Sequence, residues 1–248
     1  MPLDKLTIIG AGLLGGSIGL AARARGLAKR VSALVRRPES VAECQAIGIA
    51  DEGTLDPAEA VADADLIVLC TPISGMAGLA KRTLPDLKPG AVITDAGSTK
   101  QQLVAELTPL CAGAGARFVG SHPMAGSDQT GPSAAQANLF DGTVCVITPT
   151  SNTDASALTT GNDFWAGLGS RPVIMPADTH DRLVARCSHL PHLLASALAG
   201  RVLDPAHGEQ QAQLCATGFR DMTRLAAGSP GMWRDIVGSN RDDILAAI

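Results

Sequence analysis

Near its start the chain reads Leu6-Thr7-Ile8-Ile9-Gly10-Ala11-Gly12-Leu13-Leu14-Gly15-Gly16-Ser17. The first four residues are apolar or β-branched, as in a buried strand, and residues 18–25 have a helical composition that Gly26 can end. A G-x-G-x-x-G loop between a strand and a helix is typical of dinucleotide binding, because its glycines allow a tight turn and let the backbone approach a pyrophosphate at the helix N-terminus. The alternative is a glycine-rich turn that only packs.

Strand-like and helix-like segments alternate along the rest of the first 176 residues. Further strand-like runs lie at residues 31–35, 66–70, 91–95, 118–119, 144–148 and 171–175, and helix-like segments lie at 39–47, 100–110 and 155–168. This alternation predicts an α/β fold, with a Rossmann-type, doubly wound and mostly parallel sheet. After Pro176 only helix-like segments follow, at 178–203 and 210–227. We therefore expect a dinucleotide-binding domain over residues 1–176 and an all-α second domain over residues 177–248.

Composition excludes several classes of protein. Hydrophobic residues make up 46% of the chain and charged residues 18%, which indicates a globular protein, and the formal charge of -4 argues against nucleic-acid binding. No run of roughly 20 uninterrupted apolar residues predicts a membrane span, and glycines interrupt residues 6–22 too often for a signal peptide. The six scattered cysteines, with no C-x-x-C pair, predict buried, reduced thiols in a cytoplasmic protein.

The residues after the second predicted strand bear on the choice of cofactor. An NAD-binding unit usually places Asp or Glu there to bind the ribose 2′-hydroxyl, whereas this chain has Val35 followed by Arg36 and Arg37. Two guanidinium groups suit a 2′-phosphate, and Ser40 can add a hydroxyl. We therefore predict NADP, with NAD as the alternative cofactor. The alternative without cofactor binding is that Arg36 and Arg37 form only a solvated basic turn. The full set of predicted cofactor contacts is Gly10, Gly12, Leu13, Leu14, Gly15, Arg36, Arg37, Ser40, Thr71 and Pro72.

A histidine follows the short apolar run near residue 118, in Arg117-Phe118-Val119-Gly120-Ser121-His122-Pro123-Met124-Ala125-Gly126. The run predicts a strand that ends at Gly120 and places His122 in a loop, with Pro123 biasing it toward an extended backbone. Ligands of open α/β sheets bind beyond the carboxyl ends of strands, and histidine exchanges protons near neutral pH. His122 is therefore a candidate catalytic residue, although a lone loop histidine is more often an ordinary surface residue.

Six motifs in order give the chain a recognisable pattern: residues 10–17 (GAGLLGGS), 95–100 (DAGSTK), 120–126 (GSHPMAG), 188–192 (SHLPH), 218–224 (GFRDMTR) and 232–236 (MWRDI). In this pattern the chain resembles the prephenate/arogenate (cyclohexadienyl) dehydrogenase family of tyrosine biosynthesis. The resemblance covers nearly the whole chain, and the last five motifs are specific. It implies an NAD(P)-dependent oxidative decarboxylation, a small-molecule substrate (prephenate or arogenate), and a homodimer.

The resemblance also implies a role for individual residues. His122 matches the histidine that accepts the substrate hydroxyl proton, and Ser98 matches the serine that hydrogen-bonds it; the bland role of Ser98 is a helix N-cap before Lys100. Arg224 matches the arginine that binds a substrate carboxylate, for which a guanidinium fork is well suited. His189 and His192, three residues apart and on one helix face, match the side-chain end of the substrate site. That spacing also suits a metal, but no third ligand is evident, so we expect none.

One loop departs from the family pattern. Where many relatives have Thr-Glu after the histidine motif, this chain has Ser127-Asp128-Gln129. We list Ser127 and Asp128 as substrate-binding candidates, and Asp128 is expected to favour the amine of arogenate. In that case an Asp128→Asn variant loses arogenate activity selectively, and an equal loss on both substrates refutes the hypothesis.

Two other functions are weighed against this one. Another two-domain dehydrogenase, of the 3-hydroxyacid dehydrogenase or imine reductase type, would share the glycine loop and the helical domain. It would be expected to have a catalytic lysine in the second domain or to lack the histidine motif. A non-catalytic dinucleotide-binding module would bind cofactor without turnover, since fold does not fix function. His180 and His207 have no motif context, and we assign them a structural role.

Overall fold

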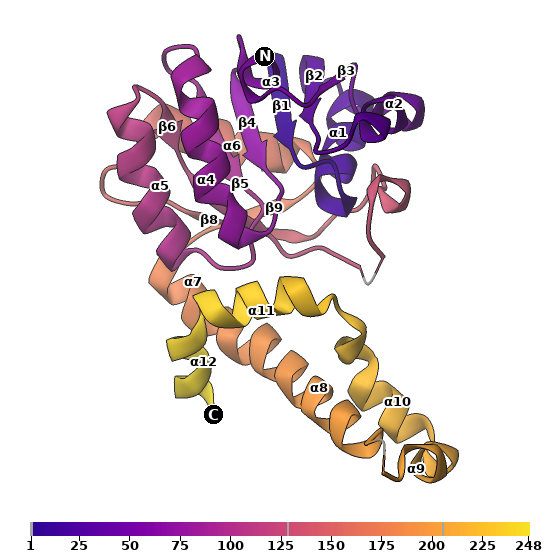
Figure 1. Ribbon diagram of the computed structural model, residues 1–248. Helices are drawn as coiled ribbons and strands as arrows, with labels where there is room; N and C mark the ends of the chain where they lie inside the picture. The colour runs from indigo at the N-terminus through magenta and orange to yellow at the C-terminus, as the bar shows by residue number, and fades with distance from the viewer. Residues whose placement is uncertain (1, 128, 205) are drawn as a thin grey trace. The chain divides into compact units, whose positions relative to one another are not determined.

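The computed structural model describes residues 2–127, 129–204 and 206–248. Over these residues the chain divides into two compact units, one ending at His180 and one beginning at Asp181 (Figure 1). The predicted domain boundary at residue 176 falls just before helix α7 (Ala177–Val184), and the division between the compact units falls within that helix. Each unit is described on its own below.

The described part of the first unit contains a six-stranded parallel sheet in the order β3-β2-β1-β4-β5-β6. Its strands are β1 (Leu3–Ile9), β2 (Ala28–Leu34), β3 (Glu52–Thr54), β4 (Leu66–Leu69), β5 (Val92–Asp95) and β6 (Arg117–Phe118). The strand order reverses between β1 and β4, so the carboxyl ends of these two strands flank the point where dinucleotides bind in such sheets. The predicted Rossmann-type, doubly wound sheet is confirmed.

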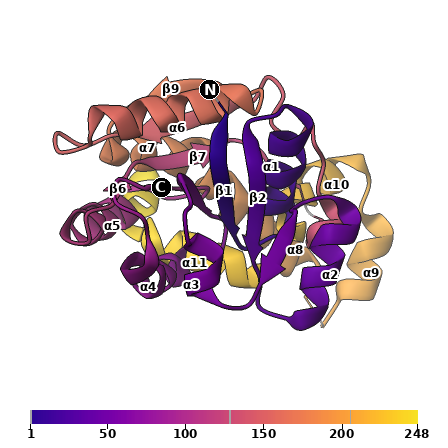
Figure 2. The same cartoon turned by 90° about the horizontal axis from the view of Figure 1, so that it is seen from above.

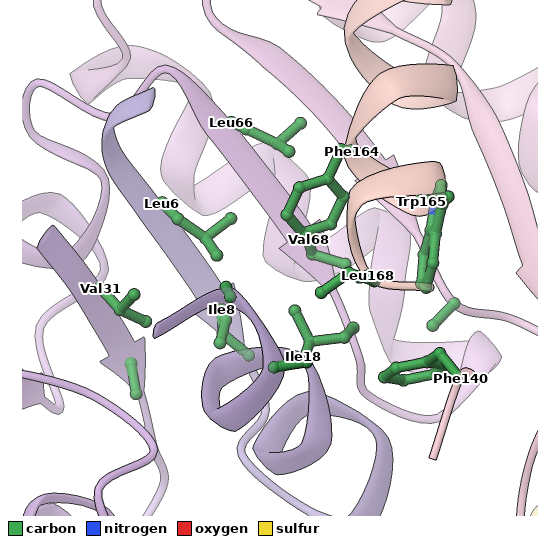
Figure 3. Packing of buried hydrophobic residues seen from close by; sticks show 14 of the residues in the cluster. Leu6, Ile8, Ile18, Val31, Leu66, Val68, Phe140, Phe164, Trp165 and Leu168 are labelled. Carbon is green, nitrogen blue, oxygen red and sulfur yellow. The ribbon is translucent and has the colours of Figure 1, made fainter. Parts of the chain in front are cut away.

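Helices cover both faces of this sheet, as Figure 2 shows from above. They are α1 (Leu13–Ala24), α2 (Pro38–Ile47), α3 (Pro57–Val61), α4 (Ile73–Thr83), α5 (Gln101–Gly113) and α6 (Ala155–Gly167), with short 3₁₀ turns at Leu84–Asp86 and Pro132–Ala134. Successive side chains of a strand point to opposite faces. Ile8 therefore belongs to the same buried cluster as Ile18 of α1 and Trp165 of α6 (Figure 3), while Ile9 belongs to a second cluster with residues of α3, α4 and α5.

The later strands of this unit leave the parallel sheet. In the described residues, β7 (Gly120–Pro123), β8 (Val144–Thr148) and β9 (Arg171–Ile174) form a separate three-stranded sheet, in which β7 and β8 are antiparallel. The expectation that the runs at residues 144–148 and 171–175 belong to the same mostly parallel sheet as the earlier strands is wrong. The physical reason is that strand β6 ends at Phe118 and the chain re-enters extended backbone at Gly120, where it pairs with β8.

The second unit is helical, as predicted. Beyond α7, a π-helical turn (Ala185–His189) leads without a break into α8 (Leu190–Val202), and Pro191 lies just after this turn. The unit continues with α9 (Gly208–Leu214), α10 (Thr217–Thr223), a 3₁₀ turn (Arg224–Ala227), α11 (Pro230–Ser239) and α12 (Arg241–Ala247). The last two helices were not predicted from the sequence.

Two properties of the whole chain were predicted as well. Every helix in the described residues is too short or too polar to cross a lipid bilayer. The cysteines are free thiols; Cys44, Cys111 and Cys145 are buried, but Cys187 is exposed, which corrects the expectation that all are buried. Burial raises the pKa of the Cys111 thiol to about 12, so this group stays protonated and inert.

Candidate active site

The three glycines of the first loop have different surroundings. Gly10 has a φ of +97°, in the left-handed region that favours glycine, and makes the tight turn after β1. A Cβ on Gly15 would lie 2.0 Å from the carbonyl oxygen of Gly10, so this glycine allows helix α1 to pack against the strand. A Cβ on Gly12 would meet no atom within 4 Å. Gly12 therefore presents open backbone, as the approach of a pyrophosphate requires.

The start of helix α1 and the end of strand β4 complete this loop. Gly12 occupies the N-cap position of α1 and provides no side-chain cap, so the N-terminus of a 12-residue helix faces the loop. Leu13 begins this helix, and Leu14 packs against the core. At the end of β4, the side-chain oxygen of Thr71 is buried without a hydrogen-bond partner, and a Cβ on Gly10 would touch the Thr71 methyl group at 2.9 Å. Pro72 is exposed at the N-cap position of α4.

The residues predicted to select NADP follow strand β2. Arg36 and Arg37 are both exposed, and Arg37 lies 3.6 Å from Glu39 in a surface ion pair. Arg37 also occupies the N-cap position of α2, which Pro38 begins, and Ser40 lies in the first turn of that helix. Both guanidinium groups are thus at the carboxyl end of β2, where a dinucleotide-binding unit contacts the ribose.

A buried polar network that the sequence did not predict lies at the end of strand β5. Asp95 forms a fully buried ion pair with Lys100, and its other carboxylate oxygen accepts the backbone N–H of Ser121 at 3.0 Å. The Ser121 hydroxyl in turn accepts the indole N–H of Trp165 at 2.8 Å and lies 2.8 Å from the hydroxyl of Thr94. This network attaches β7 to the end of β5, so the residue after Ser121 is held at the same edge of the sheet as the glycine loop.

That next residue is His122, and its surroundings differ from the prediction. His122 lies within strand β7, opposite Val146 of β8, so the prediction of a loop position is wrong, and its side chain is buried. Its ring nitrogen Nδ1 lies 2.8 Å from Nε2 of His180 on helix α7, and the two rings meet edge to face. His180, which we had assigned a structural role, is fully buried and is the partner of the candidate base. No local sequence signal connects two residues 58 positions apart.

Ser98 lies in the bend that follows strand β5 and is partly exposed. The N-cap position of helix α5 is Lys100, so the alternative role of Ser98 as the helix N-cap is wrong. Among the described residues no hydrogen bond joins Ser98 to His122, and the predicted contact between them stays a prediction.

In the second unit two predicted histidines lie around Trp233. The ring of His192 stacks on the indole at a centroid distance of 3.4 Å, and His189 meets it edge to face at 6.0 Å. Both histidines are buried, and burial lowers the pKa of His192. A Cβ on Gly228 would lie 2.5 Å from Nε1 of Trp233, so this glycine lets the backbone lie against the indole.

Of the remaining substrate-binding candidates, Arg224 and Ser127 are on the surface. Arg224 is exposed at the start of the 3₁₀ turn after α10. The exposed Ser127 accepts the backbone N–H of Gln129 at 3.1 Å, while Asp128 lies outside the described residues. Over the part of the chain that the structure describes, no group of three His, Cys, Asp or Glu side chains is placed to hold a metal ion.

The doubly wound sheet, the glycine loop and the separate helical unit define a dinucleotide-binding dehydrogenase. A family model described as the nucleotide-binding domain of prephenate dehydrogenase matches residues 18–174, and one described as its dimerization domain matches residues 176–248. The chain belongs to the prephenate dehydrogenase family, whose members are oxidoreductases of tyrosine biosynthesis.

Individual relatives agree with this assignment. The cyclohexadienyl dehydrogenase of Zymomonas mobilis is 35% identical, over 98% of this chain and 83% of that protein. The prephenate dehydrogenase of Bacillus subtilis is 33% identical over 98% of this chain and 66% of its own length. The structure of Aquifex aeolicus prephenate dehydrogenase with hydroxyphenyl propionate and NAD+ superposes with a TM-score of 0.92 at 31% identity, covering 100% of this chain and 86% of that one. A 3-hydroxyisobutyrate dehydrogenase from Mycobacterium tuberculosis, at 13% identity and a TM-score of 0.67, shares only the fold.

Proposed function

We propose that the protein oxidatively decarboxylates prephenate, arogenate or both, with His122 as the base that accepts the proton of the ring hydroxyl. The observation that carries the proposal is the buried His122, held beside the carboxyl end of β5 with its Nδ1 engaged by His180. When bound, the nicotinamide supplies the hydride acceptor for ring carbon 4, and loss of CO2 makes the ring aromatic. We assign the other requirements of this reaction to side chains of the chain itself.

The loop residues fit a dinucleotide. Gly12 leaves the backbone open, helix α1 begins without a side-chain cap, and Thr71 holds a buried hydroxyl that lacks a partner. A bound phosphate would accept from the helix N–H groups, and the Thr71 hydroxyl would gain a hydrogen bond that the protein does not give it. These three features favour a dinucleotide site over a glycine turn that only packs.

The hydrogen bond to His180 decides which atom of His122 can act as the base. With Nδ1 donating to Nε2 of His180, the lone pair of His122 is on Nε2, and this nitrogen is then the one that can take a proton. If His180 donated instead, Nε2 of His122 would carry a hydrogen and could not act as a base. We therefore propose that His180 accepts this bond and is the positioning residue of the base.

The rest of the substrate is assigned to the side chains that the family motifs single out. A guanidinium at Arg224 would bind the ring carboxylate, and Ser98 would hydrogen-bond the reacting hydroxyl. His189 and His192 would recognise the side-chain end, and Ser127 and Asp128 are also assigned to substrate binding. The Synechocystis arogenate dehydrogenase, 29% identical with a TM-score of 0.82 over 98% of this chain and 86% of that one, supports arogenate as a second substrate.

We further propose that NADP is preferred over NAD, because the residues directly after β2 are Val35, Arg36 and Arg37, with no Asp or Glu among them. NAD remains the alternative, and the Aquifex aeolicus relative was solved with NAD+. The proposal also includes a cytoplasmic homodimer, which the match to a dimerization domain supports.

The test is initial-rate reduction of NADP and of NAD by the purified protein, with prephenate and arogenate supplied separately. We expect turnover with at least one substrate and a higher kcat/KM with NADP. Cofactor binding without turnover in all four assays would overturn the enzymatic assignment and favour a non-catalytic dinucleotide-binding module.

Variants of the base and its partner sharpen this test. Replacing His122 by Asn should lower kcat about 10²–10⁴-fold, as for other general bases, with cofactor affinity unchanged. His180→Leu removes the acceptor, while His180→Gln can place an amide oxygen near the former Nε2 position. We expect a large loss of kcat in the first and partial recovery in the second. Equal losses of kcat in the two variants would contradict the positioning role of His180 and would leave the proposed role of His122 unchanged.

A further inference from the structure

Asn240 is a buried amide at the junction of helices α11 and α12. Its backbone N–H donates to the carbonyl of Ile236 at 3.0 Å, and its own carbonyl accepts from Ile244 at 3.1 Å, so the backbone here is held by both helices. The side chain is 4% exposed. An amide held this way has a definite position and orientation, and it belongs to none of the sequence motifs.

The hydrogen bonds of Asn240 determine where its protons point. The side-chain nitrogen Nδ2 lies 2.9 Å from the backbone carbonyl of Asp181, which can only accept, so the amide nitrogen and not the amide oxygen faces it. The same nitrogen lies 3.1 Å from Nδ1 of His189. An amide nitrogen has two N–H donors and does not accept, so Nδ1 of His189 must be the acceptor of the second one.

The proton of the imidazole is thereby assigned. A histidine whose Nδ1 accepts a hydrogen bond is neutral and carries its hydrogen on Nε2. The edge-to-face contact of His189 with Trp233, at 6.0 Å, restricts the plane of the ring as well. His189 is thus an N–H donor of fixed tautomer on a buried ring that is only 1% exposed.

We propose that Asn240 is the positioning residue that holds His189 as a neutral Nε2–H donor to an oxygen atom of the substrate. The proposal rests on the proposed function, in which His189 recognises the side-chain end of the substrate. A donor of fixed tautomer matches a carboxylate or keto oxygen. It cannot accept a hydrogen bond from a donor group, and Asn240 contributes to this selectivity without contacting the substrate.

The tautomer is tested first on the unmodified protein. Imidazole nitrogen NMR, with His189 identified by its loss in a His189→Ala variant, should show a proton on Nε2 and none on Nδ1 near neutral pH. A proton on Nδ1 would overturn the proposal. This measurement requires neither substrate nor turnover. Its result therefore does not depend on whether the protein has the proposed enzymatic activity.

Steady-state kinetics test the role in recognition. Asn240→Leu keeps the size of the side chain and removes the donor, and we expect KM for the substrate to rise about tenfold, kcat to change less than about twofold, and cofactor affinity to be unchanged. In a His189→Ala background the same substitution should add no further rise in KM, because the two residues act as one unit. An undiminished rise in that background would show that Asn240 does not act through His189.

Ile244→Ala is the matched control for a purely structural effect. It loosens the same helix junction through a 3% exposed apolar residue and removes no hydrogen-bonding side chain. We expect a lower unfolding temperature and an unchanged KM. If Ile244→Ala raises KM as much as Asn240→Leu does, the effect of Asn240 is structural and the proposal fails.

Discussion

His192 shows how burial sets the protonation of a side chain. Its ring lies parallel to the indole of Trp233, with an interplanar angle of 10°, and is 6% exposed. Removing the imidazole from water disfavours its charged form, and this lowers the pKa of His192 below the ordinary value of 6.5. His192 is therefore neutral at neutral pH in the folded protein.

The lowered pKa makes stability depend on pH in a definite direction. In the unfolded chain His192 takes up its proton near pH 6.5, whereas the folded protein resists protonation until a lower pH. The unfolded state therefore binds more protons as pH falls below about 6.5, and folding stability declines there. We expect the unfolding temperature to fall between pH 7.5 and 5.5, by less in His192→Gln than in the unmodified protein. An equal fall of the unfolding temperature in both proteins would show that His192 does not cause this pH dependence.

At the scale of elements, the loop between β1 and α1 separates the requirements of folding from those of binding. Gly15 is needed for packing, since a Cβ there would lie 2.0 Å from a backbone oxygen, while Gly12 has open space around it. Adding a methyl group at each position, by Gly→Ala, therefore distinguishes the role in packing from the role in dinucleotide binding.

We expect Gly15→Ala to lower the free energy of unfolding by about 1–3 kcal/mol, the usual cost of overpacking. Gly12→Ala should change it by less than about 0.5 kcal/mol, as a substitution in open space does, and yet weaken dinucleotide binding at least about tenfold. Chemical denaturation and cofactor titration of both variants measure the two effects. Unchanged cofactor affinity in Gly12→Ala would place the dinucleotide elsewhere.

The ion pair between Asp95 and Lys100 joins the end of β5 to the start of α5 and is fully buried. Replacing Lys100 by Met leaves the Asp95 carboxylate buried without its counter-ion, which usually costs about 3–5 kcal/mol. The exposed pair between Lys29 and Asp4 is the control, and Lys29→Met should lower the free energy of unfolding far less, because solvent screens this pair. Denaturant unfolding of both variants tests this, and similar losses in the two would contradict it.

At the scale of the whole molecule, the apolar residues are distributed unequally. Both hydrophobic core clusters belong almost entirely to the first unit, whereas the second has few buried apolar residues over its described part. The helical unit instead exposes large apolar side chains, among them Leu194, Leu203, Leu214 and Met222. Large exposed apolar side chains gathered in one unit favour an interaction surface there.

We expect this surface to form the predicted homodimer. Sedimentation velocity at micromolar concentration should give twice the mass of the chain. Combining Leu214→Glu with Met222→Glu should shift the protein toward monomer, because charged groups then replace side chains that are 86% and 64% exposed and cost little in the monomer itself. A monomer before any substitution would refute the prediction.

The sequence alone determined the class of fold and most of its order. Whether a short segment forms a strand, a turn or a helix depends mainly on neighbouring residues and on which side chains are buried. Both are visible in the local pattern of apolar residues and glycines. The glycine loop and the motif around His122 were identified in this way. The three-stranded sheet was not, because the pairing of β7 with β8 joins residues that no local pattern relates.

Only the tertiary structure decided how the candidate chemistry is supported. His122 and His180 are 58 positions apart in the sequence, and Asn240 and His189 are 51 apart. The spacing of the motifs therefore predicts neither contact. Buried polar groups must find hydrogen-bond partners wherever the folded chain brings them together. The identity of those partners, and with it the tautomer of each histidine, follows from packing between distant segments and not from the residues beside them.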